Sequence, residues 1–183
     1  MSDVQFGHIS DYPPGSAFES RMALSEARVH RPTQAGIAGS QRVGADSIVL
    51  SGGYEDDEDY GDTIIYTGQG GLDPNTGEVV EDQVLERGNL ALAKSMQEGH
   101  PVRVIRGAGS TSPYPPEAGY RYDGLYRVED YWREEGESGH YVWRYRLVQM
   151  DEEPEIPTRP EAQQPQSYAP APRAESTVTR VVR

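Results

Sequence analysis

The chain has 183 residues, a length typical of about one globular domain, and its 30 acidic and 17 basic residues give a net charge of −13. It contains no cysteine, which excludes disulfides and cysteine-ligated zinc sites. No run of 18 apolar residues occurs, and the N-terminus lacks the basic and then apolar pattern of a signal peptide. We therefore expect a soluble, cytoplasmic protein that has no membrane partner.

The acidic charge is unevenly distributed, which matters for nucleic-acid binding. Residues 21–50 hold four arginines against two acids, and residues 101–150 hold seven of each, so the excess acid lies in residues 51–100 and in the tail. Sixteen of the 17 basic residues are arginines, which bind phosphate in a bidentate way better than lysine does. The acidic average argues against general nucleic-acid binding, but a local and salt-sensitive DNA contact stays open.

Short elements separated by turns are predicted for the first third of the chain. Residues 1–20 are rich in turn formers and read as an ordered lead-in. In residues 21–39 the first half is compatible with a strand or with one helical turn, and the second half, with a proline and two glycines, reads as a loop. Short β-branched runs next to glycine predict strands at 47–50 and 63–66.

One longer helix is predicted in the middle of the chain. Apolar side chains recur at helical spacing over residues 82–97, although Gly88 lowers the helix propensity. Gly99 suits the left-handed conformation that often ends a helix. Alternating residues then predict a strand at 101–105.

The last part of the domain is predicted to be a hairpin followed by a linker. Strands are expected at 125–132 and 141–148, joined by the glycine-containing segment 135–139. From residue 151 the composition changes to Pro, Gln, Ala and Glu, which cannot bury enough apolar surface to order itself. We predict a mainly β domain, a twisted or barrel-like sheet over residues 1–150, and a Pro-rich flexible linker at 151–183.

An acidic stretch, with six carboxylates between residues 55 and 62, could bind a metal, face solvent or line a pocket. A calcium loop of the EF-hand type would need Gly at its sixth and Glu at its twelfth position; counted from Asp57, the glycine is fifth and the twelfth residue is Gly68. No metal is therefore predicted, although another kind of cation site stays open. A solvated turn is the simplest interpretation of four of the acids: Glu55, Asp56, Glu58 and Asp59. It leaves the glycines and tyrosines on both sides unexplained.

Seven blocks of residues, in this order, resemble the SRA domain (SET- and RING-associated, also called YDG). They are VHRPTQAGI at 29–37, GGYEDD at 52–57, YTGQGG at 66–71, NLALA at 89–93, PVRVIR at 101–106, YDG at 122–124 and VWRY at 142–145. The resemblance implies an α+β, mainly β fold: an SRA/PUA-like half-open curved β-barrel with packed helices. It also implies recognition of 5-methylcytosine, in some members 5-hydroxymethylcytosine, by turning the base out of double-stranded DNA.

The resemblance assigns a base-binding pocket to Ser51, Gly53, Tyr54, Asp57, Tyr66 and Thr67. Tyr54 and Tyr66 would sandwich the extruded ring, Asp57 would accept from the exocyclic amine of cytosine, and the backbone of the other residues would complete the edge contacts. The chemistry is consistent: extrusion costs a few kcal/mol, and stacking on an aromatic ring returns about 1–3 kcal/mol per base. A carboxylate acceptor also selects cytosine over thymine, whose equivalent atom is itself an acceptor.

Three positions depart from the mammalian methylation-maintenance member of the family. The loop at 73–81, which matches a finger that reads the opposite strand there, is shorter and acidic, so a preference for hemimethylated sites is not carried over. In the DNA insertion loop the matching residue is Gln34, which could bond the orphaned guanine or fill the vacated space. Ser51 replaces a small apolar residue, and we hypothesise that its hydroxyl tolerates a hydroxymethyl group.

Basic residues near the pocket segments are candidates for phosphate contacts. They are Arg21, His30, Arg31 and Arg42. The alternative is that one or two of them pair with Glu26 or Asp46 instead. Three further arginines in predicted strands, Arg103, Arg106 and Arg144, are expected to be structural.

Neither a catalytic centre nor a cofactor site is predicted. An HNH zinc knuckle would need cysteines, Lys94 lies between Ala93 and Ser95 rather than beside carboxylates, and Asp57 would be poorly placed to activate water at a sugar. The patterns SGGYxDDEDYGD and DQxLxRGNLALAxS resemble the N-terminal SRA domain of prokaryotic SRA–HNH modification-dependent restriction endonucleases. The expected partner is double-stranded DNA with modified cytosine, with the protein at the nucleoid when bound.

Several alternatives stay open for the whole protein. The tail would lead to a nuclease domain absent from this chain, and a homodimer could form through the parent protein. Otherwise the chain is a stand-alone methyl-DNA reader, a base-processing enzyme, or an acidic protein-interaction module that ignores DNA modification.

Overall fold

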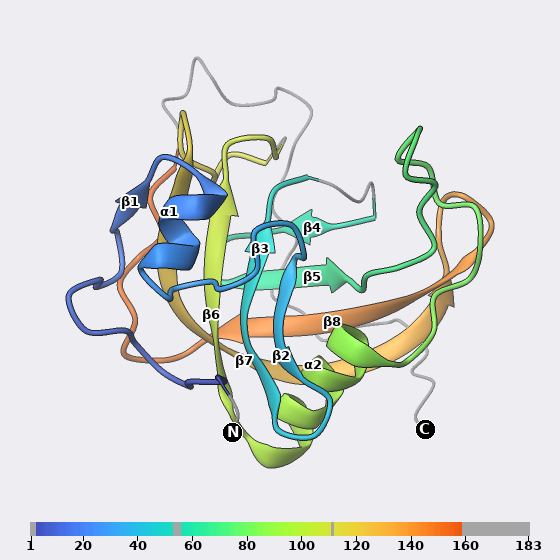
Figure 1. The fold of residues 1–183 in the computed structure, drawn as a ribbon, viewed down its shortest axis with the longest axis horizontal. Helices are drawn as coiled ribbons and strands as arrows, with labels where there is room; N and C mark the ends of the chain where they lie inside the picture. Colours follow the sequence, from blue (N-terminus) through green and yellow to red (C-terminus); the bar gives the residue numbers. More distant parts are fainter. Residues whose placement is uncertain (1–2, 53–55, 111, 159–183) are drawn as a thin grey trace.

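The computed structural model describes residues 3–52, 56–110 and 112–158. Their fold is one eight-stranded sheet with two helices (Figure 1). The elements are β1 (Ala17–Phe18), α1 (Arg21–Glu26), β2 (Ile37–Ser40), β3 (Gly44–Leu50), β4 (Glu58–Asp59), β5 (Thr63–Thr67), α2 (Arg87–Glu98), β6 (Pro101–Gly107), β7 (Tyr120–Glu135) and β8 (Tyr141–Gln149).

The sheet is curved and open. Its strand order is β2-β3-β6-β7-β8-β5-β4, with β1 paired to β7, so β2 and β4 end the path without meeting. Only the β3–β6 pair is parallel among the described strands. A parallel pair needs a long crossover, which the chain supplies here with β4, β5 and α2. The expected mainly β, half-open curved barrel with packed helices is confirmed.

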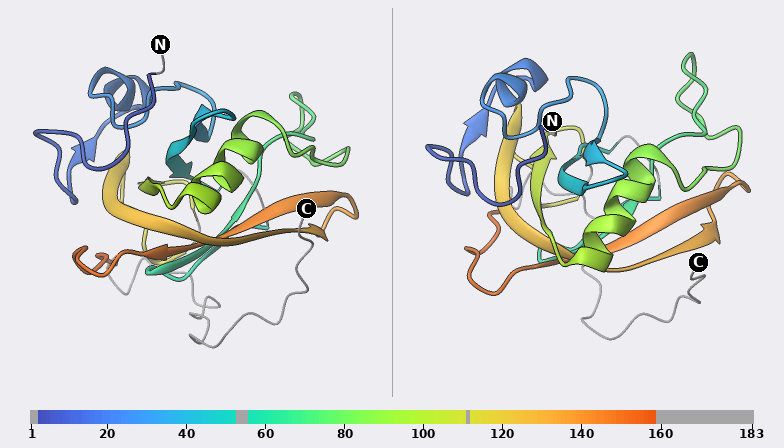
Figure 2. Two further views of the ribbon diagram at one scale, coloured as in Figure 1. Left: turned by 90° about the horizontal axis from the view of Figure 1, so that it is seen from below. Right: turned by 60° about the horizontal axis from the view of Figure 1, so that its bottom comes forward.

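The helix α2 fills the concave side of the sheet. It lies between the β2–β3 hairpin and β7 (Figure 2), and it buries Ala91, Leu92 and Ala93 completely. These side chains join one hydrophobic cluster with residues of the surrounding strands, such as Ile48 and Tyr145. The helix ends, as predicted, at a left-handed Gly99 with φ 75°.

The predicted start of this helix is wrong by five residues, because α2 begins at Arg87 rather than at residue 82. The segment before it runs beside β8. The Gln83 amide nitrogen donates to the Gly68 carbonyl at 2.7 Å, and its Oε1 accepts from the Trp143 backbone N–H at 2.9 Å. The backbone N–H of Gln83 also donates to the Tyr141 carbonyl. These tertiary bonds hold the segment extended despite its helical spacing.

The strands predicted at 47–50, 63–66, 101–105, 125–132 and 141–148 are all present, and β7 is longer than expected. The prediction that the second half of residues 21–39 is a loop is wrong from Ile37 on, because Ile37 and Ala38 are buried and paired with β3. The glycine that suggested a loop, Gly39, lies instead at a β-bulge with φ 141°. Two very short strands, β1 and β4, were not predicted.

Of the two conformations left open after residue 20, the structure has the helix. In α1 the N-cap is Ser20, whose hydroxyl accepts from the Ala23 backbone N–H at 3.1 Å. This helix and β1 pack over a second, smaller cluster that contains Phe18, Leu24 and Tyr122. In the described part of the chain, neither helix is long and apolar enough to cross a membrane.

The start of the predicted linker still contacts the domain. Glu153 Oε1 accepts from the Leu125 backbone N–H at 2.8 Å, and Ile156 is buried. Most of the remaining tail, residues 159–183, lies outside the described residues, so the flexible linker stays a prediction.

Candidate nucleic-acid interface

Three of the predicted pocket residues meet at the end of β5. The Thr67 backbone N–H donates to Asp57 Oδ1 at 2.7 Å, which ties the loop acid to the strand. Tyr66, the preceding residue, is buried, and its hydroxyl lies 3.2 Å from the Gly36 carbonyl oxygen and 3.3 Å from that of Val49. A side chain at Gly36 would place its Cβ 2.8 Å from this hydroxyl, so glycine is needed for the approach.

Asp57 is a half-buried carboxyl with unusual electrostatics. Burial raises its pKa from 3.8 to about 7, and the hydrogen bond from the Thr67 amide and the charge of Arg144 only partly oppose this. The buried Thr67 hydroxyl beside it also lowers the pKa of Asp57, as a hydrogen-bonding neighbour of the carboxyl. A carboxyl whose pKa is raised toward neutral by burial is typical of a ligand site.

The other side of the predicted pocket is only partly placed. Gly53 and Tyr54 lie outside the described residues, so the second ring of the expected sandwich is not located. Ser51 follows β3 directly and is exposed. A Cβ at Gly109 would lie 2.8 Å from the Ser51 carbonyl oxygen, so the loop after β6 approaches this strand end closely.

The solvated-turn interpretation is wrong for two of its four acids, Asp56 and Asp59, which are buried, whereas Glu58 is exposed and Glu55 lies outside the described residues. Asp59 is buried and forms two hydrogen bonds with the buried Arg106, at 2.8 and 2.7 Å. Asp56 is also buried, and its Oδ1 accepts from the Glu137 backbone N–H at 3.1 Å. Glu58 pairs with Arg144 at 2.8 Å. The hydrogen bonds of Asp56 and Asp59 thus hold the segment on both sides of Asp57.

The YDG tripeptide belongs to the scaffold of the domain. Asp123 is buried and binds Arg106 at 3.0 Å and Arg121 at 2.8 Å. The Tyr122 hydroxyl bonds His8 Nδ1 at 2.7 Å, and Gly124 has φ 95° beside the Glu153 side chain. With Arg103, also buried, this network agrees with the structural role expected for the strand arginines.

The predicted insertion residue Gln34 is exposed. The side chains of Arg21 and His30 form hydrogen bonds with backbone carbonyls of its loop. Arg21 Nη2 donates to the carbonyl oxygens of Pro32 at 3.1 Å and Ala35 at 2.6 Å. His30 Nε2 lies 2.9 Å from the Ala35 carbonyl oxygen and must therefore carry the proton, so its Nδ1 accepts from the Ser47 hydroxyl at 2.8 Å.

The phosphate contact predicted for His30 is incompatible with this position. The ring is fully buried, both nitrogens are occupied, and burial lowers its pKa to about 3, so it is uncharged at neutral pH. Arg31 pairs with Asp46 at 2.9 Å, which is the alternative raised for these residues. Arg42 is exposed in the turn between β2 and β3 and, with Arg21 and Arg31, stays a candidate.

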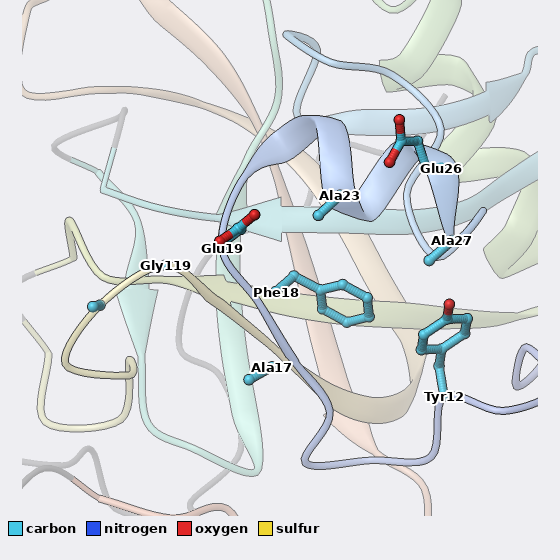
Figure 3. Close-up of a pocket in the computed structure, with 9 residues that line it drawn as sticks. Tyr12, Ala17, Phe18, Glu19, Ala23, Glu26, Ala27 and Gly119 are labelled. Carbon is cyan, nitrogen blue, oxygen red and sulfur yellow. The ribbon is translucent and has the colours of Figure 1, made fainter.

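A separate groove of about 780 Å³ lies between β1, α1 and the loop before β7 (Figure 3). Its walls are mixed: the rings of Phe18 and Tyr12 are in contact, and Glu19 and Glu26 add two carboxylates. None of the predicted site residues lines it, and its acidic character is unsuited to phosphate. Within the described ranges there is also no cluster of three side chains that could hold a metal ion.

The profile of the SAD/SRA domain family matches residues 5–153. The chain belongs to this family. Among curated relatives of the SRA domain, the E3 ubiquitin-protein ligase UHRF1 of Rattus norvegicus is 44% identical over 174 residues, which is 84% of this chain and 22% of that protein. The E3 ubiquitin-protein ligase ORTHRUS 2 of Arabidopsis thaliana is 44% identical over 147 residues, or 76% of this chain and 23% of that protein. The chain thus spans less than a quarter of these relatives.

Solved structures of SRA domains have the same fold. The modification-dependent TagI restriction endonuclease is 50% identical with a TM-score of 0.78, covering 80% of this chain and 53% of that one. The SUVH5 SRA domain in complex with fully methylated CG DNA is 42% identical with a TM-score of 0.70, covering 84% and 99%. The SUVH5 SRA domain bound to fully hydroxymethylated CG DNA is 41% identical with a TM-score of 0.70, and the coverage of the two chains is again 84% and 99%. The resemblance found in the sequence is confirmed.

Proposed function

We propose that this SRA domain binds duplex DNA containing 5-methylcytosine and holds the modified base, turned out of the helix, beside Asp57 and Tyr66. The observation that carries the proposal is the half-buried Asp57 carboxyl, which the Thr67 amide holds against β5 at 2.7 Å and whose pKa burial raises to about 7. Burial of an acid in this way is destabilising, so a ligand that uses it is the simplest reason for its presence.

The arrangement suits a flat base with an exocyclic amine. Asp57 Oδ1 accepts from the Thr67 N–H, and the fixed carboxylate can also accept from the amine of cytosine. The hydroxyl of Tyr66 lies against two backbone carbonyls, so its ring is fixed before a base arrives. Stacking on this ring and on Tyr54 at about 1–3 kcal/mol each would offset the few kcal/mol needed for extrusion.

The relatives support the proposal. SUVH5 SRA domains have been crystallised with fully methylated CG, hemimethylated CG and methylated CHH DNA, at 41–42% identity to this chain. KRYPTONITE, 38% identical with a TM-score of 0.77, was crystallised with mCHH DNA. Because these contexts differ, we leave the flanking sequence open.

The test is a titration of matched unmodified and 5-methylcytosine duplexes by fluorescence anisotropy. We expect the parent to prefer the modified duplex at least about tenfold, which corresponds to about 1.4 kcal/mol. Asp57→Ala should lose this preference and keep weak, salt-sensitive binding, while Glu155→Gln, a change in an exposed acid after β8, should behave as the parent. Equal affinity of Asp57→Ala and the parent for methylated DNA would refute the pocket.

A hydroxymethyl group is a second candidate ligand. Ser51 is exposed at the end of β3, and one SUVH5 SRA structure contains hydroxymethylated DNA. We propose that the Ser51 hydroxyl accommodates the extra oxygen. If Ser51→Ala retains the parent's ratio of 5-hydroxymethylcytosine to 5-methylcytosine affinities, this role of Ser51 is excluded.

For the whole protein, we propose that the chain is the DNA-reading part of a modification-dependent HNH restriction endonuclease. The similarity to TagI supports a restriction context, and this chain aligns with 53% of that one. The chain alone should bind without cutting. Incubation with methylated duplex and Mg²⁺ distinguishes the alternatives: released base would indicate a base-processing enzyme, strand breaks a nuclease, and absence of binding an acidic protein-interaction module.

A further inference from the structure

Arg144 forms hydrogen bonds with the two residues that flank Asp57. Its Nη2 donates to the carbonyl oxygen of Asp56 at 2.7 Å and to Glu58 Oε2 at 2.8 Å. These are the residues directly before and after Asp57 in the chain. The Arg144 side chain is only 5% exposed, whereas that of Glu58 is 47% exposed, so the guanidinium reaches the segment from the interior.

The same arginine lies opposite the residue that holds the Asp57 carboxyl. In the antiparallel pairing of β5 with β8, Thr67 is the register partner of Arg144. Asp57 is therefore tied to β5 through the Thr67 amide and to β8 through Arg144. A third strand completes the support, because Arg144 Nη1 donates to Glu134 Oε2 in β7 at 3.3 Å.

The charges around the segment make Arg144 electrostatically important. The titratable groups around Asp57 and Arg144 are Asp56 and Glu58 on the segment, Tyr60, whose hydroxyl donates to Glu58, and Glu134 on β7. Arg106 in β6 pairs instead with Asp59, further along the same stretch, and with Asp123. Burial raises the pKa of Asp57 most and the charge of Asp56 adds to it, whereas the hydrogen bonds of Thr67 and the charge of Arg144 lower it.

We propose that Arg144 is a positioning residue of the base pocket: it fixes the Asp57 segment from both sides and supplies the positive charge that lets the Asp57 carboxylate accept from a base. The inference rests on the proposed function and extends it to a residue that does not itself contact DNA. A purely structural arginine would stabilise the fold without setting the pH range of base discrimination.

The experiment follows Asp57 in two independent ways. The ¹³C shift of its carboxyl is titrated in the free protein, and the ratio of dissociation constants for unmodified and 5-methylcytosine duplexes is measured from pH 5.5 to 9. Each measurement gives a midpoint pH: that of the carboxyl titration and that of the change in the ratio. In Arg144→Met both midpoints should rise by about one pH unit, the effect expected from losing a nearby opposite charge. Arg144→Lys, which keeps the charge, should titrate close to the parent.

Two further variants control for charge and for folding. Arg146→Gln removes an equal charge two residues along β8, from a side chain that pairs with Glu129, and should leave both midpoints unchanged. Glu134→Gln removes an acid that partly neutralises Arg144, and should move the midpoints down. It decides the question if Arg144→Met does not fold, because a downward shift supports the proposal and no shift overturns it.

The outcomes separate this inference from the proposed function. If the parent shows no preference for methylated DNA at any pH, the proposed function fails, and the role of Arg144 in a base pocket fails with it. If the parent discriminates but Arg144→Met has the same midpoints as the parent, only the role of Arg144 is overturned.

Discussion

Asp57 has properties that favour binding and oppose folding. Its pKa is raised to about 7 in the folded chain, so the folded state holds a proton that the unfolded state releases near pH 3.8. The contribution of this group to stability is therefore greatest below pH 3.8 and is lost as the pH rises toward 7. Above pH 7, the free protein carries a half-buried charge that the amine of a base would stabilise.

We predict that Asp57→Asn stabilises the free protein, and does so more at pH 8 than at pH 5. The asparagine side chain can still accept from the Thr67 amide but has no charge to desolvate. By linkage, the difference in unfolding free energy between variant and parent should grow by about 2–3 kcal/mol over this range, or about 5–10 °C in Tm. Thermal unfolding at both pH values provides the measurement, and a pH-independent difference would contradict the raised pKa.

Single residues show what the sequence could and could not predict. Asp57, Tyr66 and Thr67 lie close together in the chain and fall in family-like blocks, so their proximity was predictable. The burial of Asp59 was not, because its partner Arg106 lies 47 residues away. The burial of His30 was not predictable either, because its partner Ser47 lies 17 residues away in β3.

On the scale of elements, the loop 32–35 is shaped by side chains outside it. Arg21, at the start of α1, and His30 bond its carbonyls, and these bonds satisfy backbone groups that a loop otherwise exposes. The loop presents Gln34 to solvent, so its conformation is set before any DNA contact.

We predict that Arg21→Gln weakens binding to methylated duplex about three- to tenfold, more than loss of one charge explains, because the insertion loop loosens. Arg28→Gln, which removes an exposed arginine just after α1, is the matched control for charge. Hydrogen exchange of residues 32–36 should become faster in Arg21→Gln alone. Equal loss of affinity in both variants would show that Arg21 acts only through its charge.

Gly88 illustrates how tertiary packing overrides helix propensity. Propensity alone predicts that Gly88→Ala stabilises α2 by about 1 kcal/mol. However, a Cβ at this position would lie 3.0 Å from Ile37 Cβ and 2.8 Å from the Gln69 amide nitrogen. We therefore predict destabilisation by about 1 kcal/mol or more, measured by chemical unfolding, whereas Gln97→Ala on the exposed face should be neutral or stabilising.

For the whole molecule, the fold class could be predicted from the sequence, but the order and pairing of the strands could not. Strand and helix patterns indicated a mainly β domain, and the family resemblance supplied the half-open barrel. Local patterns do not reveal that β3 pairs in parallel with β6 across an intervening helix, since register and strand order depend on non-local contacts. The helix start failed for the same reason, because Gln83 is held by β8.

The net charge of −13 constrains how the whole molecule can bind DNA. Few basic side chains are available at the predicted rim: Arg21 and Arg31 already bond protein oxygens, and Arg42 is exposed. We predict a shallow salt dependence, with log K falling against log salt with a slope no steeper than about −3, since each phosphate contact contributes about −0.9. Arg42→Gln should reduce the slope by about one.

Base discrimination, in contrast, should be independent of salt. The Asp57 and Tyr66 contacts are made inside a pocket, where screening by ions is weak. Raising the salt from 50 to 200 mM should therefore lower the affinities for methylated and unmodified duplexes by the same factor and leave their ratio unchanged. Anisotropy titrations of both duplexes at four salt concentrations test this. A ratio that collapses toward one at high salt would mean that the preference arises from phosphate contacts rather than from the base pocket.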